Sequence, residues 1–219
     1  MKQLSPFTLE MARPTPGLDD LAFSLAREFG APDIRSACDV LEDLACELMT
    51  AAFLSPVEQC TACSLLLGST ARLRSARDLE PSAFMVDRVL DRREGHPLAL
   101  ALVYSEVGRK AGIPLWPASN GERFLVGYVG VETLPLVLDP CAGGRRLAVD
   151  EVPDDLRWLC PHEVGFELLD RMRDAFELRG DLAAALRAVE LALAVTLPTA
   201  GPLRERLECD RARVLARLN

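Results

Sequence analysis

Residues 89–115, VLDRREGHPLALALVYSEVGRKAGIPL, decide the fold of this chain. From Pro97 onward the stretch is strongly apolar, and Pro is favoured at the first position of a helix. Gly112 and then Pro114 follow the apolar run, which is a typical end for a helix. The pattern therefore predicts a helix over residues 98–111. Its nearly continuous apolar sequence suits a helix that is enclosed on several sides.

The sequence pattern changes to that of β-strands after residue 115. Residues 124–129 and 134–138 are short runs of Val, Leu and aromatic side chains, separated by a segment that contains Gly and Glu. Asp139 and Pro140 then begin a glycine-containing turn. We expect the two runs to form antiparallel strands that pack against the helix.

Helical patterns lie on both sides of this central part. Apolar side chains recur at helical spacing in the stretches 18–29, 33–53, 56–68, 81–91, 162–179, 182–196 and 202–218. The order is therefore helices, a central helix, antiparallel strands and a helical tail. This order predicts a fold of the α+β class.

A set of short motifs runs in a fixed order through residues 81–147. As they stand in this chain, they are VLDRREGHPLALALVY at 89–104, GIPL at 112–115, FLV at 124–126 and DPCAGG at 139–144. In order and spacing they resemble the bacterial transglutaminase-like family with tetratricopeptide-like tails, the SirB-type group. The resemblance implies a papain-like core, in which a central helix packs on an antiparallel sheet.

The same resemblance implies a division of the chain into two domains. A transglutaminase-like domain takes residues 1–160, which are helical over 1–80 and hold the core at 81–160. A tetratricopeptide-like helical tail takes residues 161–219. Because a single repeat is too short for a solenoid, we expect this tail to pack on the main domain.

The tail matches the second half of a tetratricopeptide repeat at several positions. These positions are Gly180, Asp181, Ala185, Val189, Ala192 and Pro198. Such a repeat needs small residues where its paired helices touch. One position departs from the pattern, because Arg173 stands where the repeat has a small residue.

Transglutaminase-like enzymes resemble papain-like proteases in using a cysteine, a histidine and an aspartate. At the nucleophile position this chain has Ala99, whose methyl group cannot attack a substrate, and SirB-type relatives often carry Ser there. At the histidine position it has Arg123, which stays protonated and cannot act as a general base. Only Asp139 matches the family pattern. We therefore predict a degenerate triad of Ala99, Arg123 and Asp139.

Two interpretations of Asp139 remain open at this stage. A carboxylate at the end of a strand, before Pro140 and a Gly-Gly turn, commonly accepts hydrogen bonds from turn amides. Alternatively, Asp139 pairs with Arg123 across adjacent strands through a charge-assisted contact. The second arrangement keeps the former site folded without supporting chemistry.

Cys141 and His96 are the candidates for a rearranged nucleophile and base. Cys141 lies two residues after Asp139, and His96 precedes the central helix. We expect ordinary packing for Cys141 and a helix-capping role for His96, with catalysis as the alternative. Cys60 and Cys63 form a CxxC pattern without a second pair of ligands, so we expect two buried thiols on one helix face rather than a metal or redox site.

The net charge and the composition disfavour some classes of binding partner and some locations in the cell. The formal net charge of −8 disfavours nucleic acid and anionic lipid, so we expect neither as a partner. No apolar run is long enough to span a membrane, and the first 13 residues lack the apolar core of a signal peptide. Seven scattered cysteines favour reduced thiols. We expect a cytoplasmic protein without a cofactor or metal.

These observations lead to two functional hypotheses. The first is a non-catalytic transglutaminase-like protein that binds a protein or peptide as a binding or regulatory module, through the degenerate cleft, the tail or both. The alternative is a thiol-dependent amide hydrolase or acyltransferase with a rearranged site that uses Cys141 and His96. The reactivity of Cys141 distinguishes them, because only the enzyme requires an activated thiol.

Overall fold

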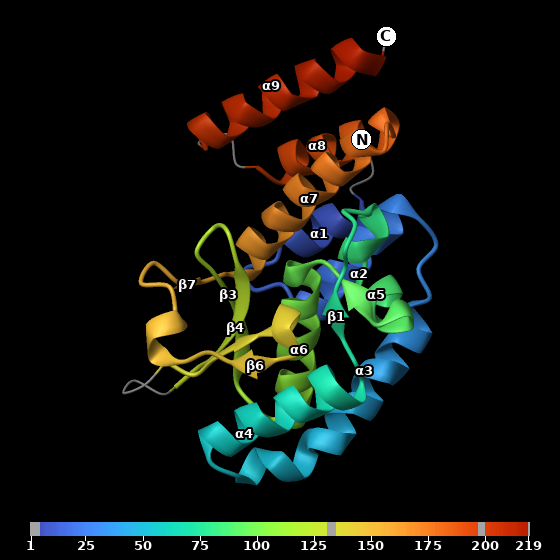
Figure 1. The fold of residues 1–219 in the computed structure, drawn as a ribbon. Helices are drawn as coiled ribbons and strands as arrows, with labels where there is room; N and C mark the ends of the chain where they lie inside the picture. Colours follow the sequence, from blue (N-terminus) through green and yellow to red (C-terminus); the bar gives the residue numbers. More distant parts are fainter. Residues whose placement is uncertain (1–4, 131–134, 197–199, 219) are drawn as a thin grey trace. The chain divides into compact units, whose positions relative to one another are not determined.

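The computed structural model describes residues 5–130, 135–196 and 200–218 (Figure 1). The described chain forms two compact units, and each is treated by itself. The sheet unit consists of residues 32–78 and 82–159. The helical unit consists of the described parts of residues 1–31, 79–81 and 160–219.

The sheet unit contains helices, short helical turns and strands. Its longer helices are α3 (Ile34–Leu48), α4 (Pro56–Cys63), α5 (Val86–Arg92) and α6 (Pro97–Ala111). Its short helical turns are η1 (Met49–Phe53), η2 (Ser64–Thr70), η3 (Pro81–Phe84, whose first residue belongs to the helical unit), η4 (Pro140–Ala142) and η5 (Val149–Glu151). Its strands are β1 (Arg74–Ser75), β2 (Glu94–Gly95), β3 (Leu115–Ser119), β4 (Phe124–Tyr128), β5 (Val137–Asp139), β6 (Arg145–Arg146) and β7 (Arg157–Trp158).

Five of the strands form one antiparallel sheet in the order β6-β5-β4-β3-β7. The predicted antiparallel pairing is confirmed, since β4 pairs with β5 through Val126 opposite Leu138. The second strand begins at Val137, later than predicted, and Leu134 lies outside the described residues. Strand β3, the short edge strands β6 and β7, and the small parallel pair of β1 and β2 were not predicted from the sequence.

Helix α6 is the buried centre of the sheet unit, as predicted. Its residues are buried without interruption from Leu98 to Gly108. It packs against β3 and β4 on one side and against α3 on another. At its end, Gly112 adopts a left-handed conformation with φ of 80°, which glycine reaches without a Cβ clash. The enclosure on several sides explains why this helix shows no strongly polar face.

Helix α4 continues into a π-helical turn, η2, where the sequence pattern predicted one helix over residues 56–68. The turn brings Gly68 close to the backbone of Gly143. A Cβ atom on Gly68 would lie 1.8 Å from the carbonyl oxygen of Gly143, which is far inside contact distance. Glycine at position 68 therefore allows the turn after β5 to approach this helix.

The helical unit consists of the first two and the last three helices. They are α1 (Pro6–Met11), α2 (Leu18–Phe29), α7 (Pro161–Leu178), α8 (Leu182–Val195) and α9 (Gly201–Leu218). Helix α8 packs against α7, α9 and α1, and α2 packs against α7. Thus residues 5–31 lie with the tail in one compact unit, whereas the sequence-based division assigned them to the main domain.

The predicted small residues of the tail lie at a helix contact. Ala185, Val189 and Ala192 are buried on α8, while Pro198 lies outside the described residues. Arg173 on α7, which departs from the repeat pattern, is nearly buried and donates hydrogen bonds to Asp170 and Asp174 of its own helix and to Asp210 of α9. The large cation therefore joins α7 to α9 at a position where a small residue was expected.

Candidate functional site

The predicted triad positions lie on three elements of the sheet unit. Ala99 stands in the first turn of α6, Arg123 directly precedes β4, and Asp139 ends β5. The turn η4, which follows Asp139, packs against α6. The fold thus brings the start of β4, the end of β5 and α6 into one region, as the resemblance implied.

The nucleophile position is closed to solvent. Ala99 has an exposed fraction of 0% and presents only a methyl group. A helix N-terminus lowers the pKa of a nearby thiol, and this is the usual means of activating a cysteine at the start of a helix. Here the helix start carries no group that can be activated at position 99.

Arg123 and Asp139 form the predicted ion pair. Nη2 of Arg123 lies 2.9 Å from Oδ2 of Asp139 and donates a hydrogen bond to it. The other carboxylate oxygen of Asp139 accepts hydrogen bonds from the backbone N–H groups of Cys141 at 2.9 Å and Ala142 at 3.3 Å. Both interpretations of Asp139 are therefore correct, since the same carboxylate holds the turn and the arginine.

His96 caps helix α6, as predicted. Its Nδ1 accepts a hydrogen bond of 3.2 Å from the backbone N–H of Leu98. Its ring stacks on Phe84 with a centroid distance of 4.3 Å and meets Phe124 edge-on at 5.7 Å. An accepting Nδ1 carries no proton in this arrangement. His96 is therefore a packed helix cap between two aromatic rings.

Cys141 lies in the turn η4 as an exposed residue, yet its thiol is not activated. Partial burial of the thiol, followed by the negative charge of Asp139, raises its pKa to about 11. A hydrogen bond with Ser75 and the charge of Arg123 oppose this shift only in part. Since the thiolate is the nucleophilic form, Cys141 is a poor nucleophile near neutral pH.

Tyr104 is a residue of this region that the sequence analysis did not single out. It is fully buried, and its hydroxyl has no hydrogen-bond partner among the described residues. A Cβ atom on Gly144 would lie 2.8 Å from that hydroxyl. Burial raises the pKa of Tyr104, so it remains a phenol. Both residues belong to the motifs at 89–104 and 139–144, and their contact gives these motifs a structural role.

The CxxC cysteines are buried on one face of α4, as expected. Cys60 and Cys63 both have an exposed fraction of 0%. Burial raises their pKa values to about 11 and about 12. All seven cysteines lie in the described ranges, and none forms a disulfide. Within the same ranges, no cluster of His, Cys, Asp and Glu has the composition of a metal site.

Comparison with known proteins agrees with this geometry. The sequence pattern of the Transglutaminase-like superfamily matches residues 18–173, and the chain belongs to this superfamily. The matched range takes in residues of both compact units. No solved structure matches the chain.

Curated relatives are bacterial proteins named UPF0162 protein. One from Xylella fastidiosa strain 9a5c is 38% identical over 91 residues, which are 42% of this chain and 31% of the relative. A second, from Xylella fastidiosa strain Temecula1, is 39% identical over 83 residues, or 38% and 28% of the two chains. A third, from Pseudomonas aeruginosa, is 44% identical over 69 residues, or 32% and 24%. The matches span less than a third of each relative's length.

The structure also bears on the membrane prediction. Among the helices of the described residues, none combines the length and the apolar character that a membrane span requires. This agrees with the absence of a long apolar run in the sequence.

Proposed function

We propose that this chain is a non-catalytic member of the Transglutaminase-like superfamily, of the SirB-type group with a tetratricopeptide-like tail, and that it binds a protein or peptide. The observation that carries the proposal is the composition of the former site. Ala99 is buried at the nucleophile position, and Arg123 pairs with Asp139 at 2.9 Å where a histidine base would be needed.

The chemistry of the site supports a chain without turnover. In a cooperative triad, loss of one member already removes most of the rate. Here the nucleophile and the base are both replaced, and the guanidinium is a permanent cation where a neutral imidazole would have to accept a proton. Asp139 accepts hydrogen bonds from the turn after β5 and from Arg123, so the scaffold persists without the reaction.

The core and the helical tail are both of kinds that bind peptides in other proteins. Papain-like cores hold extended chains, and helical repeats present grooves to peptide segments. Arg123 keeps 42% of its side chain exposed, so the cation is available to a ligand beside the ion pair. We propose a cytoplasmic location, in keeping with seven unbridged cysteines, and neither nucleic acid nor membrane as partner, in keeping with the net charge of −8.

The test combines capture with a charge reversal. Tagged protein is incubated with extract of its source cells, and the retained proteins are identified by mass spectrometry. We expect a specific partner that is lost with Arg123→Glu and kept with Arg35→Glu, a reversal at an exposed position of α3. Capture of no partner, or equal loss in both variants, contradicts a binding role for the former cleft.

The rival enzyme hypothesis is tested by mapping thiol reactivity. The raised pKa of Cys141 and the packing of His96 between two rings do not favour it. Treatment with iodoacetamide near neutral pH, followed by peptide mapping, should label the exposed Cys46 and Cys209 before Cys141. A single fast-reacting Cys141 would instead support a thiol-dependent hydrolase or acyltransferase.

A further inference from the structure

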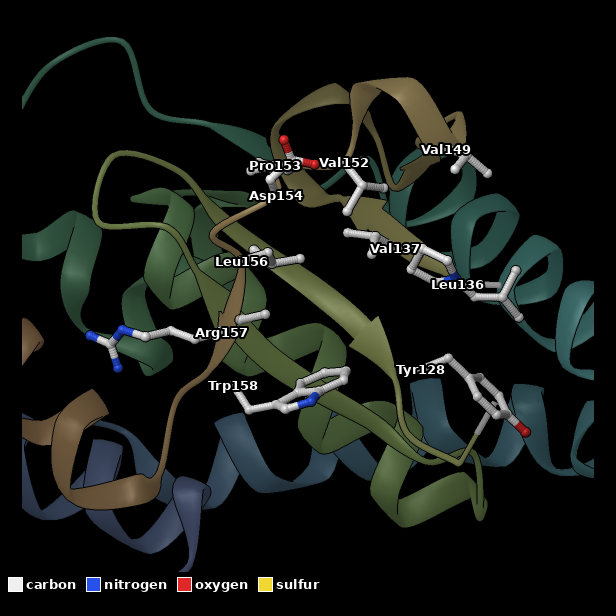
Figure 2. Close-up of a pocket in the computed structure, with 12 residues that line it drawn as sticks. Tyr128, Leu136, Val137, Val149, Val152, Pro153, Asp154, Leu156, Arg157 and Trp158 are labelled. Atoms are coloured by element: carbon white, nitrogen blue, oxygen red, sulfur yellow. The ribbon is translucent and has the colours of Figure 1, made fainter. Parts of the chain in front are cut away.

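The sheet unit carries a pocket that is separate from the degenerate triad. It has a volume of about 420 Å³, within the usual range for ligand pockets. Its lining comes from β3, β4, β5 and β7 and from the segment between β6 and β7. Figure 2 shows Leu156, Val137 and Trp158 around one space, while Arg157 extends away from it. We call this the Trp158 pocket.

The pocket lies on the face of the sheet that α6 does not cover. Phe124 reaches the start of α6 through its contact with His96, so the next residue of the strand, Leu125, points to the opposite face. There Leu125 packs with Val137 and Leu147 in a small core beneath the pocket. The pocket floor is therefore firmly supported.

Trp158 is the most exposed aromatic surface of the pocket. Its residue is 51% exposed, although it belongs to a strand of the sheet. It packs over Gly127 of β4, where a Cβ atom would lie 2.4 Å from Cη2 of the indole. Glycine at this strand position therefore lets the indole lie close against the sheet. A large apolar side chain that is held in place yet exposed to water often marks a binding site.

The rim of the pocket carries more negative than positive charge. Arg157 also lines the pocket, but its side chain extends away from the space (Figure 2). Asp154 lines the pocket, and Asp150 and Asp155 flank it in the same segment. Over the ranges that the structure describes, no ion pair involves any of these three carboxylates. Glu151, in contrast, is paired with Arg145 at 2.7 Å. The unpaired charges therefore favour a cationic ligand and disfavour an anionic one.

We propose that the Trp158 pocket binds an extended segment of a partner protein in which an apolar side chain stands beside an arginine or lysine. The apolar side chain fills the space between Leu156 and Val137. The cation lies over the face of the indole, where the ring quadrupole attracts it, and the acidic side chains of residues 150–155 favour its approach. This inference goes beyond the proposed function, because it names a second binding surface whose lining contains none of Ala99, Arg123 and Asp139.

The test is a selection from a display library of random 12-residue peptides on the whole protein. The enriched peptides are then measured by fluorescence anisotropy on the natural protein and on variants. We expect enriched sequences with an apolar residue beside Arg or Lys. Their binding should weaken at least about tenfold with Trp158→Ala. It should weaken about threefold with Asp154→Asn, with a loss that shrinks at high salt.

Three controls separate the possible outcomes. Asp154→Lys reverses an exposed charge and is expected to abolish binding while leaving the circular dichroism spectrum unchanged. Phe53→Ser removes an apolar side chain that is 91% exposed in η1, and binding should persist. Arg35→Glu reverses an exposed charge on α3, and binding should persist as well.

Each alternative result has a definite meaning. Peptides that bind Trp158→Ala normally but lose affinity with Arg123→Glu would overturn this inference and leave the proposed function standing. Enriched peptides without a cationic residue would overturn the inference as well. Absence of any enriched peptide would overturn the inference alone, because the proposed function is tested separately by the capture experiment with Arg123→Glu.

Discussion

Two regions of the sheet unit, the predicted triad positions and the Trp158 pocket, differ in how their polar and apolar groups are used. At the predicted triad positions and the start of α6, Ala99 is buried, His96 is packed between two rings, and Asp139 is engaged by Arg123 and two backbone N–H groups. In the Trp158 pocket, Trp158 is half exposed and Asp154 has no ion-pair partner among the described residues. The groups at the predicted triad positions are thus buried or paired, whereas the pocket keeps an exposed indole and an unpaired carboxylate that suit a ligand.

Some residues of the family motifs have a packing role that does not depend on catalytic activity. Tyr104 and Gly144 both belong to the family motifs, and they contact each other beneath the turn after β5. These residues maintain the architecture whether or not a nucleophile is present. A strong family resemblance therefore identifies the fold, and the site residues have to be judged one by one.

The largest effect is expected from Gly68→Ala, which tests the close contact between η2 and the turn after β5. The new methyl group would lie 1.8 Å from the carbonyl oxygen of Gly143, and backbone atoms cannot yield as a flexible side chain can. We expect a loss of about 3 kcal/mol in the free energy of unfolding, measured in urea by circular dichroism. Gly30→Ala is the matched control, because nothing lies within 4 Å of its Cβ position. Equal stability of the two variants would refute the close approach.

A smaller effect is expected from removing the carboxylate that holds the turn. Asp139→Ala loses the ion pair with Arg123 and the acceptor for two backbone N–H groups, so we expect a loss of about 2 kcal/mol. Arg123→Gln removes only the partly exposed ion pair and should cost less than about 1 kcal/mol. If both variants lose the same stability in urea titrations, the hydrogen bonds to the turn contribute nothing.

In the Trp158 pocket, Gly127→Ala should cost little stability but displace the indole of Trp158. The added methyl group would meet the far end of the Trp158 ring at 2.4 Å, and this ring can move outward. We expect a loss of about 1 kcal/mol and a red shift of the Trp158 emission, measured in a Trp116→Phe background. An unchanged emission spectrum would show that the indole does not lie against Gly127.

The smallest effect concerns the pH dependence of the segment that walls the pocket. Arg145 and the backbone N–H of Ala148 hold the pKa of Glu151 down to about 2. A lowered folded-state pKa gives stability that is present above the unfolded pKa near 4.5 and is lost as the pH falls toward 2. Glu151→Gln should therefore flatten the stability profile between about pH 4.5 and 2. Identical profiles for natural protein and variant would contradict the pairing.

The sequence predicted the parts of the fold that depend on local patterns. Helix α6 was predicted from its continuous apolar run and its Gly112 stop, and the pairing of β4 with β5 from two short strand runs. Strands β6 and β7 have two residues each, which is too short for an alternating pattern. The π-helical turn after Cys63 lies against Gly143, a residue distant in the sequence, and this contact has no local signal.

The site was predicted only in part, because some of its contacts join segments that are distant in the sequence. The replacements at Ala99 and Arg123 were visible in the motif, and the Arg123–Asp139 contact followed from the expected neighbouring strands. The role of Tyr104 was missed because its contact with Gly144 joins distant segments. The Trp158 pocket was missed because it requires Gly127 and Trp158, which lie on β4 and β7 with β3 between them. Its only sequence signal was a tryptophan that follows an acidic segment.

The most direct test of the central claim is turnover by the natural protein. The protein is incubated with a fluorescent primary amine and a glutamine-containing peptide, and separately with unfolded casein, and products are followed by mass spectrometry. We predict no product above the buffer blank, and none with Ala99→Cys alone, because the base is still absent. The double variant Ala99→Cys with Arg123→His tests whether the scaffold still holds the triad geometry. Turnover by the natural protein that disappears with Asp139→Ala or Cys141→Ser would contradict the account.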